Sequence, residues 1–108
     1  MKQLKADLRQ FVKDRKWNQY HSPKNLAMAL SVEVAELVEI FQWLTEEESR
    51  EFNLDNFKNI MDEIGDVQIY LTMIADYFNI CPIACAKAKL EKNKIKHPIE
   101  DNKFDKFK

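Results

Sequence analysis

The chain has 108 residues, a length that favours a single domain. One glycine and three prolines leave little material for the tight turns of a small all-β protein, while helix-forming residues dominate. No apolar run approaches the roughly 20 residues of a membrane span, and the first residues alternate in charge instead of forming a signal-peptide core. These observations predict an all-α, cytoplasmic protein without a membrane partner.

Apolar spacing and capping signals predict the first helices. An amphipathic helix is expected over residues 2–16, where apolar side chains recur every three or four positions. Ser22 is a credible N-cap and Pro23 a credible first helical residue, so a second helix should run from there to about residue 44. Thr45 and the acidic residues after it predict a short turn or brief helix.

Two further helices are expected in the second half of the chain. Asn53 or Asp55 can cap a third, long helix that carries a sustained apolar stripe and ends near Asn79. Pro82 begins a fourth helix that should continue through about Asn93.

No repeat or linker divides the chain, so one domain is expected over residues 1–98, with a weakly structured C-terminal tail over residues 99–108. The long helices carry apolar residues on more than one face, as in "IGDVQIYLTMIADYF". A lone bundle of this size cannot bury them all, which predicts an oligomer.

Charge is segregated along the chain behind a net value of −1. Residues 25–86 hold twelve acids and two bases, whereas the two ends together hold six acids and fifteen bases. An acidic middle is a poor platform for nucleic acid, so no nucleic-acid partner is expected. A small phosphorylated ligand fits better.

Two pairs of carboxylates lie three residues apart on the two long helices: Glu33 with Glu36, and Glu63 with Asp66. Residues at this spacing share one face of a helix. None of the four has a base three or four positions away, where the counter-charge of a surface glutamate usually lies. Such carboxylates among apolar neighbours repel one another and are costly to desolvate unless a cation joins them.

A hard divalent ion is the natural partner for this group. Oxygen-only ligands favour Mg²⁺, or Mn²⁺, over zinc, copper or iron. The two histidines, His21 and His97, fall outside both long helices, so the Glu-x-x-His pattern of di-iron bundles is missing. The competing interpretation is that basic side chains from the two ends neutralise the carboxylates.

Other residues could complete a site for a nucleotide. Mg²⁺ held by carboxylates keeps positions open for water and substrate phosphates. Bases of the last helix could clasp the outer phosphates: Lys87, Lys89, Lys92, Lys94 and Lys96. Aromatic rings and a histidine could stack on a base, although such residues at helix edges are more often core: Trp17, Tyr20, His21, Trp43 and Tyr70.

Three segments resemble the MazG-like family of all-α nucleoside triphosphate pyrophosphohydrolases, especially its dCTP pyrophosphatase-like branch. They are "RKWNQYHSPKNLAMALSVEVAELVEIFQW", "DEIGDVQIYL" and "KAKLEKNKIKHP", and the match covers about residues 8–98. The ordered set W-x-x-F/Y-H, P-K/R-N-L, E-x-x-E-L, F-Q-W, E-x-x-D-V and K-x-x-x-N is far more specific than any single piece.

The resemblance implies Mg²⁺-dependent hydrolysis of a nucleoside triphosphate, usually a deoxynucleotide such as dCTP, to the monophosphate and pyrophosphate. It also implies a four-helix-bundle-type fold in homodimers or homotetramers, with sites completed between subunits. The metal ligands carried over by position are Glu33, Glu36, Glu63 and Asp66, of which Glu36 or Glu63 would also position the attacking water. The residues implied for the base and sugar are Trp17, His21, Asn25, Trp43 and Tyr70. Those implied for the phosphates are Lys89, Asn93 and Lys96.

Two other functional classes stay open. One is a non-catalytic helical module that binds a nucleotide and Mg²⁺ or a protein partner. The other is a plain structural bundle whose acids are buffered by the basic ends. Release of pyrophosphate distinguishes the enzyme from the module, and calorimetric titration with metal distinguishes both from the plain bundle.

Overall fold

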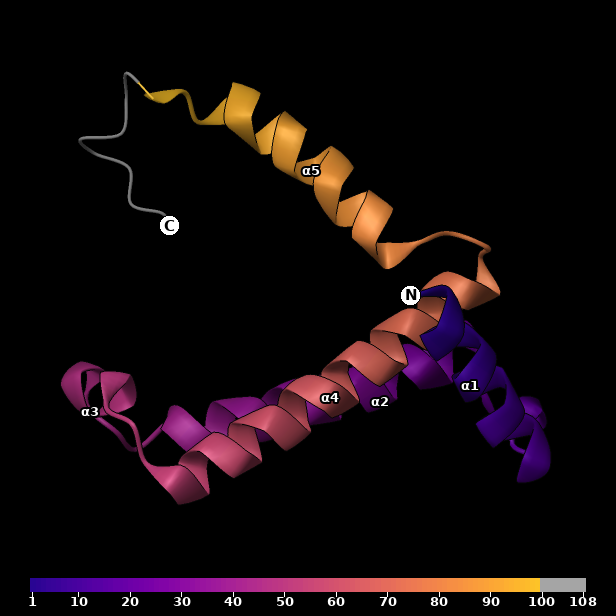
Figure 1. Ribbon diagram of the computed structural model, residues 1–108, viewed down its shortest axis with the longest axis horizontal. Helices are drawn as coiled ribbons and strands as arrows, with labels where there is room; N and C mark the ends of the chain where they lie inside the picture. The colour runs from indigo at the N-terminus through magenta and orange to yellow at the C-terminus, as the bar shows by residue number, and fades with distance from the viewer. Residues whose placement is uncertain (100–108) are drawn as a thin grey trace.

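Figure 1 shows the computed structural model, in which helices joined by short loops make up residues 1–99. The structure describes residues 1–99, so the predicted tail from residue 100 onward lies outside the described residues. The elements in chain order are α1 (Lys2–Asp14), the 3-10 turn η1 (Asn18–Tyr20), α2 (Pro23–Phe41), α3 (Glu46–Arg50), α4 (Leu54–Tyr77) and α5 (Pro82–Lys96). No strand occurs between residues 1 and 99, which confirms the all-α prediction for that range.

Capping side chains set the starts of three helices where the sequence predicts them. Ser22 caps α2 through its side-chain oxygen, which accepts a hydrogen bond at 3.1 Å from a backbone N–H in the first turn. Thr45 and Glu48 form a reciprocal capping box, so the acidic segment after Thr45 is a short helix. Asn53 caps α4, and Asp55 lies in the first turn of that helix.

The helix ends differ from the predicted ones by two or three residues. Both α1 and α4 end two residues early, because Lys16 and Asn79 adopt the left-handed backbone conformation with φ of 58° and 60°. Likewise α2 ends at Phe41, short of residue 44. In contrast, α5 continues to Lys96, beyond its predicted end.

The antiparallel pair of α2 and α4 is the centre of the fold (Figure 1). The shorter α1 packs across the C-terminal part of α4, while α5 turns away from the pair at an angle of 93° to α4. No single helix in the described range is long and apolar enough to cross a membrane. Only the bent pair α4–α5 passes that test, by length and composition alone.

Few side chains are buried in one chain. Val12, Leu26 and Ala75 are the buried apolar residues among the described ones, and Thr72 is the buried polar residue. The chain exposes 8832 Å² at a mass of 12.9 kDa, whereas a compact monomer of that mass exposes roughly 6,300 Å². Large apolar side chains therefore remain exposed along α2, α4 and α5.

Candidate functional site

The contact between α2 and α4 is an apolar seam that contains two glutamates. Its side chains recur every three or four residues, as the packing of one helix on another requires. The row on α2 is Leu26, Leu30, Glu33, Leu37 and Ile40, and the row on α4 is Ile60, Glu63, Val67, Tyr70 and Ile74; all are buried or half-buried. Glu33 and Glu63 thus occupy positions where the pattern would otherwise place an aliphatic residue.

Three carboxylates meet in this seam. Glu33, Glu36 and Glu63 each offer an oxygen, and these oxygens all lie within 4.8 Å of one another. Glu33 Oε1 and Glu63 Oε1 are buried and have no hydrogen-bond partner. A buried polar atom without a partner is costly, so this arrangement needs a cation or a proton to be stable.

Repulsion and burial raise the pKa of two of these carboxyls. The pKa of Glu36 lies above its ordinary value chiefly because of the negative charge of Glu63. Burial is the main reason that the pKa of Glu63 is raised, and the neighbouring Glu33 carboxyl raises it further. Within residues 1–99 no ion pair joins a base to any of the three. Bases from the chain ends therefore do not neutralise this cluster in the described part of the chain.

Asp66, the fourth predicted ligand, is half-buried on α4, one turn beyond Glu63. Its charge contributes to the raised pKa of both Glu36 and Glu63, so it faces the same site. Its oxygens nevertheless lie outside the group of three mutually close carboxylates. The structure thus brings three of the four predicted ligands together and leaves Asp66 at the edge.

The donor set fits a hard divalent cation. Only carboxylate oxygens are offered, which suits Mg²⁺ or Mn²⁺ and does not suit metals that prefer nitrogen or sulfur. The two partnerless oxygens of the seam are the atoms that such an ion would satisfy. Three carboxylates leave room in an octahedral ion's coordination for water and phosphate oxygens.

The residues predicted for the base and sugar lie at both ends of α2. Trp17, His21 and Asn25 lie at its start, whereas Trp43 follows its end and is 87% exposed. A helix of 19 residues is about 28 Å long, so Trp43 cannot reach Trp17 and His21 in the same chain. Tyr70 is half-buried in the seam, nearer to the acids.

The residues predicted for the phosphates all lie on α5. Lys89, Asn93 and Lys96 follow one another along this helix, which diverges from the α2–α4 pair (Figure 1). A single chain therefore does not bring them to its own carboxylate cluster.

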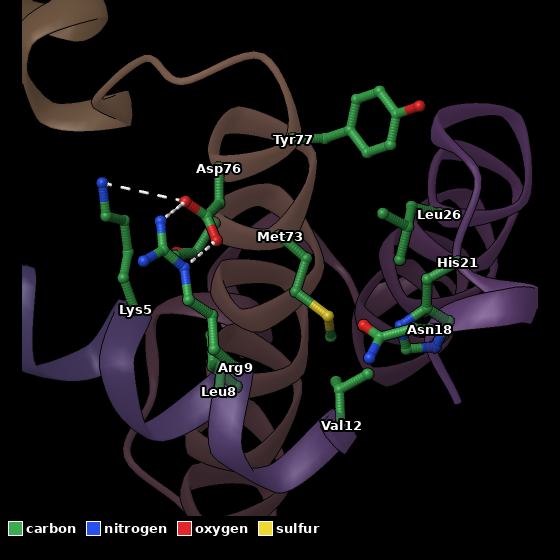
Figure 2. Close-up of a pocket in the computed structure, with 11 residues that line it drawn as sticks. Lys5, Leu8, Arg9, Val12, Asn18, His21, Leu26, Met73, Asp76 and Tyr77 are labelled. Carbon is green, nitrogen blue, oxygen red and sulfur yellow. Dashed lines mark hydrogen bonds and ion pairs between the residues drawn. The ribbon is translucent and has the colours of Figure 1, made fainter. Parts of the chain in front are cut away.

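A pocket of about 130 Å³ opens where α1, η1 and the start of α2 meet the C-terminal part of α4. Figure 2 shows its two sides, with Asn18, His21 and Leu26 on one and Lys5, Arg9 and Asp76 on the other, and with Met73 between them. Of the predicted site residues only His21 lines it. Local spacing could not reveal the contact of Arg9 with Asp76, because the two are 67 residues apart. The one feature of the sequence that points to such a contact is the excess of bases at the start of the chain and of acids in its middle.

The family model for MazG-like proteins matches residues 28–106. The chain belongs to the MazG-like family. The resemblance of its three sequence segments to that family is therefore confirmed.

Two curated proteins are similar to this chain over most of its length. The dCTP pyrophosphatase 1 of Bos taurus is 32% identical over 92 residues, which cover 83% of this chain and 54% of that protein. For the Homo sapiens protein of the same name the identity is 33% over 91 residues, with coverage of 82% and 54%. The chain thus spans about half the length of the curated relatives it matches.

A solved structure supports the MazG-like fold. The crystal structure of a pyrophosphatase from Archaeoglobus fulgidus is similar with a TM-score of 0.85 and 45% sequence identity. The similarity covers 91% of this chain and 92% of the archaeal one, so the helices described above are shared almost completely.

Removing one charge from the carboxylate cluster should stabilise the metal-free protein. Because the pKa values of Glu36 and Glu63 are raised by folding, the folded state binds more protons than the unfolded state above pH of about 4.3, the ordinary glutamate value. The wild type in EDTA should therefore become more stable as the pH falls from 7 towards 5. Melting curves should show a higher Tm for Glu36→Gln at pH 7 and a flatter dependence on pH.

The matched control for this experiment is Glu39→Gln. Glu39 lies one turn further along α2, outside the group of three close carboxylates, and its charge raises the pKa of Glu36 less than that of Glu63 does, so its substitution should change Tm less. If Glu36→Gln melts below the wild type in EDTA, the carboxylates are satisfied by groups other than a cation, and the repulsion described here is wrong.

Proposed function

We propose that this protein is a Mg²⁺-dependent nucleoside triphosphate pyrophosphohydrolase, with dCTP or a base-modified relative as its substrate. The observation that carries the proposal is the pair of buried, partnerless oxygens of Glu33 and Glu63 in the α2–α4 seam. The names of the similar proteins, dCTP pyrophosphatase and pyrophosphatase, support the same reaction class. The proposal assigns the activity to residues 1–98, and a cytoplasmic location stays a prediction from the sequence.

The proposed roles follow from the chemistry of attack on the α-phosphorus. The carboxylates of Glu33, Glu36 and Glu63 would hold the ion, with Asp66 at the edge of the site. When bound, the ion supplies positive charge for the phosphates and lowers the pKa of a coordinated water. Glu36 and Glu63 are the two carboxylates proposed to position the attacking water as well. Either could accept the proton of the attacking water, and no side-chain nucleophile is needed.

The pocket in Figure 2 is the proposed site for the nucleoside. It adjoins the acidic site along the same two helices, since Leu26 precedes Glu33 by seven residues and Met73 follows Asp66, at the edge of the site, by seven. Seven residues are two helical turns, or about 10 Å. A base held beside His21 would therefore have its phosphates within reach of the carboxylates.

We infer that the working form is a homodimer or homotetramer. The radius of gyration is 17.2 Å, compared with roughly 13 Å for a compact domain of this length, and apolar faces of the long helices are exposed. Trp43 and the basic residues of α5 lie away from the acidic cluster of their own chain. A second copy could place them there, because a basic α5 and an acidic α2–α4 pair are complementary in charge.

The proposed reaction releases pyrophosphate and leaves a nucleoside monophosphate. A panel of canonical and base-modified deoxynucleoside triphosphates with Mg²⁺ should yield both products, with dCTP or a modified relative turned over fastest. Glu36→Gln should lower kcat/KM by about 100-fold or more, because a bound metal contributes several kcal/mol of charge stabilisation. Release of inorganic phosphate with a nucleoside diphosphate would contradict the assignment.

Metal binding provides a separate measurement that needs no turnover. Mg²⁺ should bind only the folded site and raise the Tm of the wild type as its concentration increases. Glu36→Gln should lose most of this gain, whereas Glu39→Gln should keep it. An equal gain in all three proteins would exclude Glu36 as a ligand.

The proposed assembly predicts a mass above that of one chain. Light scattering should give a multiple of 12.9 kDa at micromolar protein concentrations. A mass of one chain at every concentration tested would contradict the proposed dimer or tetramer.

A further inference from the structure

Ion pairs join separate helices at one place in the described range, around Asp76 near the end of α4. Arg9 Nε donates a hydrogen bond to Asp76 Oδ2 at 2.8 Å, and Arg9 Nη2 donates a second to Oδ1. Lys5 Nζ lies 3.9 Å from the same Oδ1. The Asp76 side chain is 18% exposed, so this contact is shielded on the acid side. Two parallel hydrogen bonds fix the rotation of α1 on α4 as well as its distance.

The end of α1 holds the residues that follow it. Lys16 adopts a left-handed backbone conformation, and the next residue, Trp17, donates its N–H to the carbonyl of Val12 at 3.1 Å. The Trp17 ring also packs edge-on against Phe11, with ring centroids 5.7 Å apart. Trp17 therefore moves with α1. Its ring is in turn 6.2 Å from the ring of His21, centroid to centroid.

The chain between α1 and α2 is fixed at its other end to α2. Asn25 Nδ2 donates a hydrogen bond to the carbonyl of Tyr20 at 2.9 Å, and Ser22 caps the helix. Asn25, which the sequence predicts as a substrate ligand, thus orders the backbone beside His21 in this structure. Residues 15–22, here called the strap, are held by α1 at one end and by α2 at the other.

We infer that Arg9 and Asp76, which line the proposed nucleotide pocket themselves, also position its opposite wall: they hold α1 against α4, and α1 in turn places Trp17 beside His21. Neither residue belongs to the carboxylate cluster, so loss of the pair should weaken nucleotide binding and spare the chemical step. The inference rests on the proposed function where it concerns the nucleotide, and on the geometry of the strap where it concerns Trp17.

The hydrogen bond from Arg9 also lowers the pKa of Asp76 below its ordinary value, so this carboxyl is ionised at neutral pH. Asp76→Asn removes the charge at nearly constant volume, while Asp76→Glu keeps it. With the preferred triphosphate and Mg²⁺, Asp76→Asn should raise KM by about 10-fold and change kcat by less than about 2-fold. Asp76→Glu should restore most of the wild-type KM.

A matched control comes from another ion pair. Arg50→Met removes the pair of Arg50 with Glu46, which lies within α3 and is exposed on both sides, so KM should not change. If Asp76→Asn does not fold, Arg9→Gln tests the same contact from its exposed partner. A fall in kcat at constant KM, or identical behaviour of Asp76→Asn and Asp76→Glu, would overturn the inference.

Fluorescence of Trp17 tests the positioning without turnover. In a Trp43→Phe background Trp17 is the one remaining tryptophan. Adding Asp76→Asn should shift its emission to the red and increase quenching by iodide, while adding Asp76→Glu should not. Unchanged emission in both variants would overturn the inference. Should the wild type hydrolyse no triphosphate, the proposed function fails, and this measurement still decides whether the ion pair positions the strap.

Discussion

The rest of this structure depends on two glutamates placed where α2 and α4 would otherwise pack aliphatic side chains. The α2–α4 pair is the only extensive contact between helices in the described chain, and Glu33 and Glu63 interrupt it at its centre. Each leaves a buried oxygen without a partner. The seam therefore stabilises the fold less than its apolar pattern suggests. The lost stability comes from burying the carboxylate oxygens of these two glutamates without partners. Capping residues and the contact of Arg9 with Asp76 stabilise the helices around it.

The basic ends of the chain, as far as the structure describes them, do not neutralise the carboxylates between α2 and α4. Bases of α1 reach one acid of the middle, Asp76, and not the cluster in the seam. In α5, Lys94 forms an ion pair with Glu91 of the same helix. The helix as a whole still carries more positive than negative charge. In the proposed assembly a second copy would bring this positive charge to the acidic cluster, where it would suit a polyanion such as a triphosphate.

The sequence predicted those features that depend on neighbours within one or two helical turns. Ser22, Thr45 and Asn53 were identifiable as caps because a cap acts on the first turn after it. The grouping of Glu33, Glu36 and Glu63 followed from shared helix faces and missing bases. The place of Asp66 did not, because the rotation of α4 against α2 decides which oxygens meet. The contact of Arg9 with Asp76 and the direction of α5 depend on the tertiary arrangement, which local spacing does not specify.

The left-handed residue at the start of the strap has a consequence for its conformational entropy. This position is usually glycine, and a side chain there costs about 1 kcal/mol or more. The chain has a single glycine and uses Lys16 at this turn. A residue with a Cβ samples far less of backbone space than glycine does, so the unfolded strap has less freedom to lose on folding. The turn before Trp17 is correspondingly stiffer than a glycine turn would be, so less backbone entropy is lost when the strap takes up its place beside the pocket.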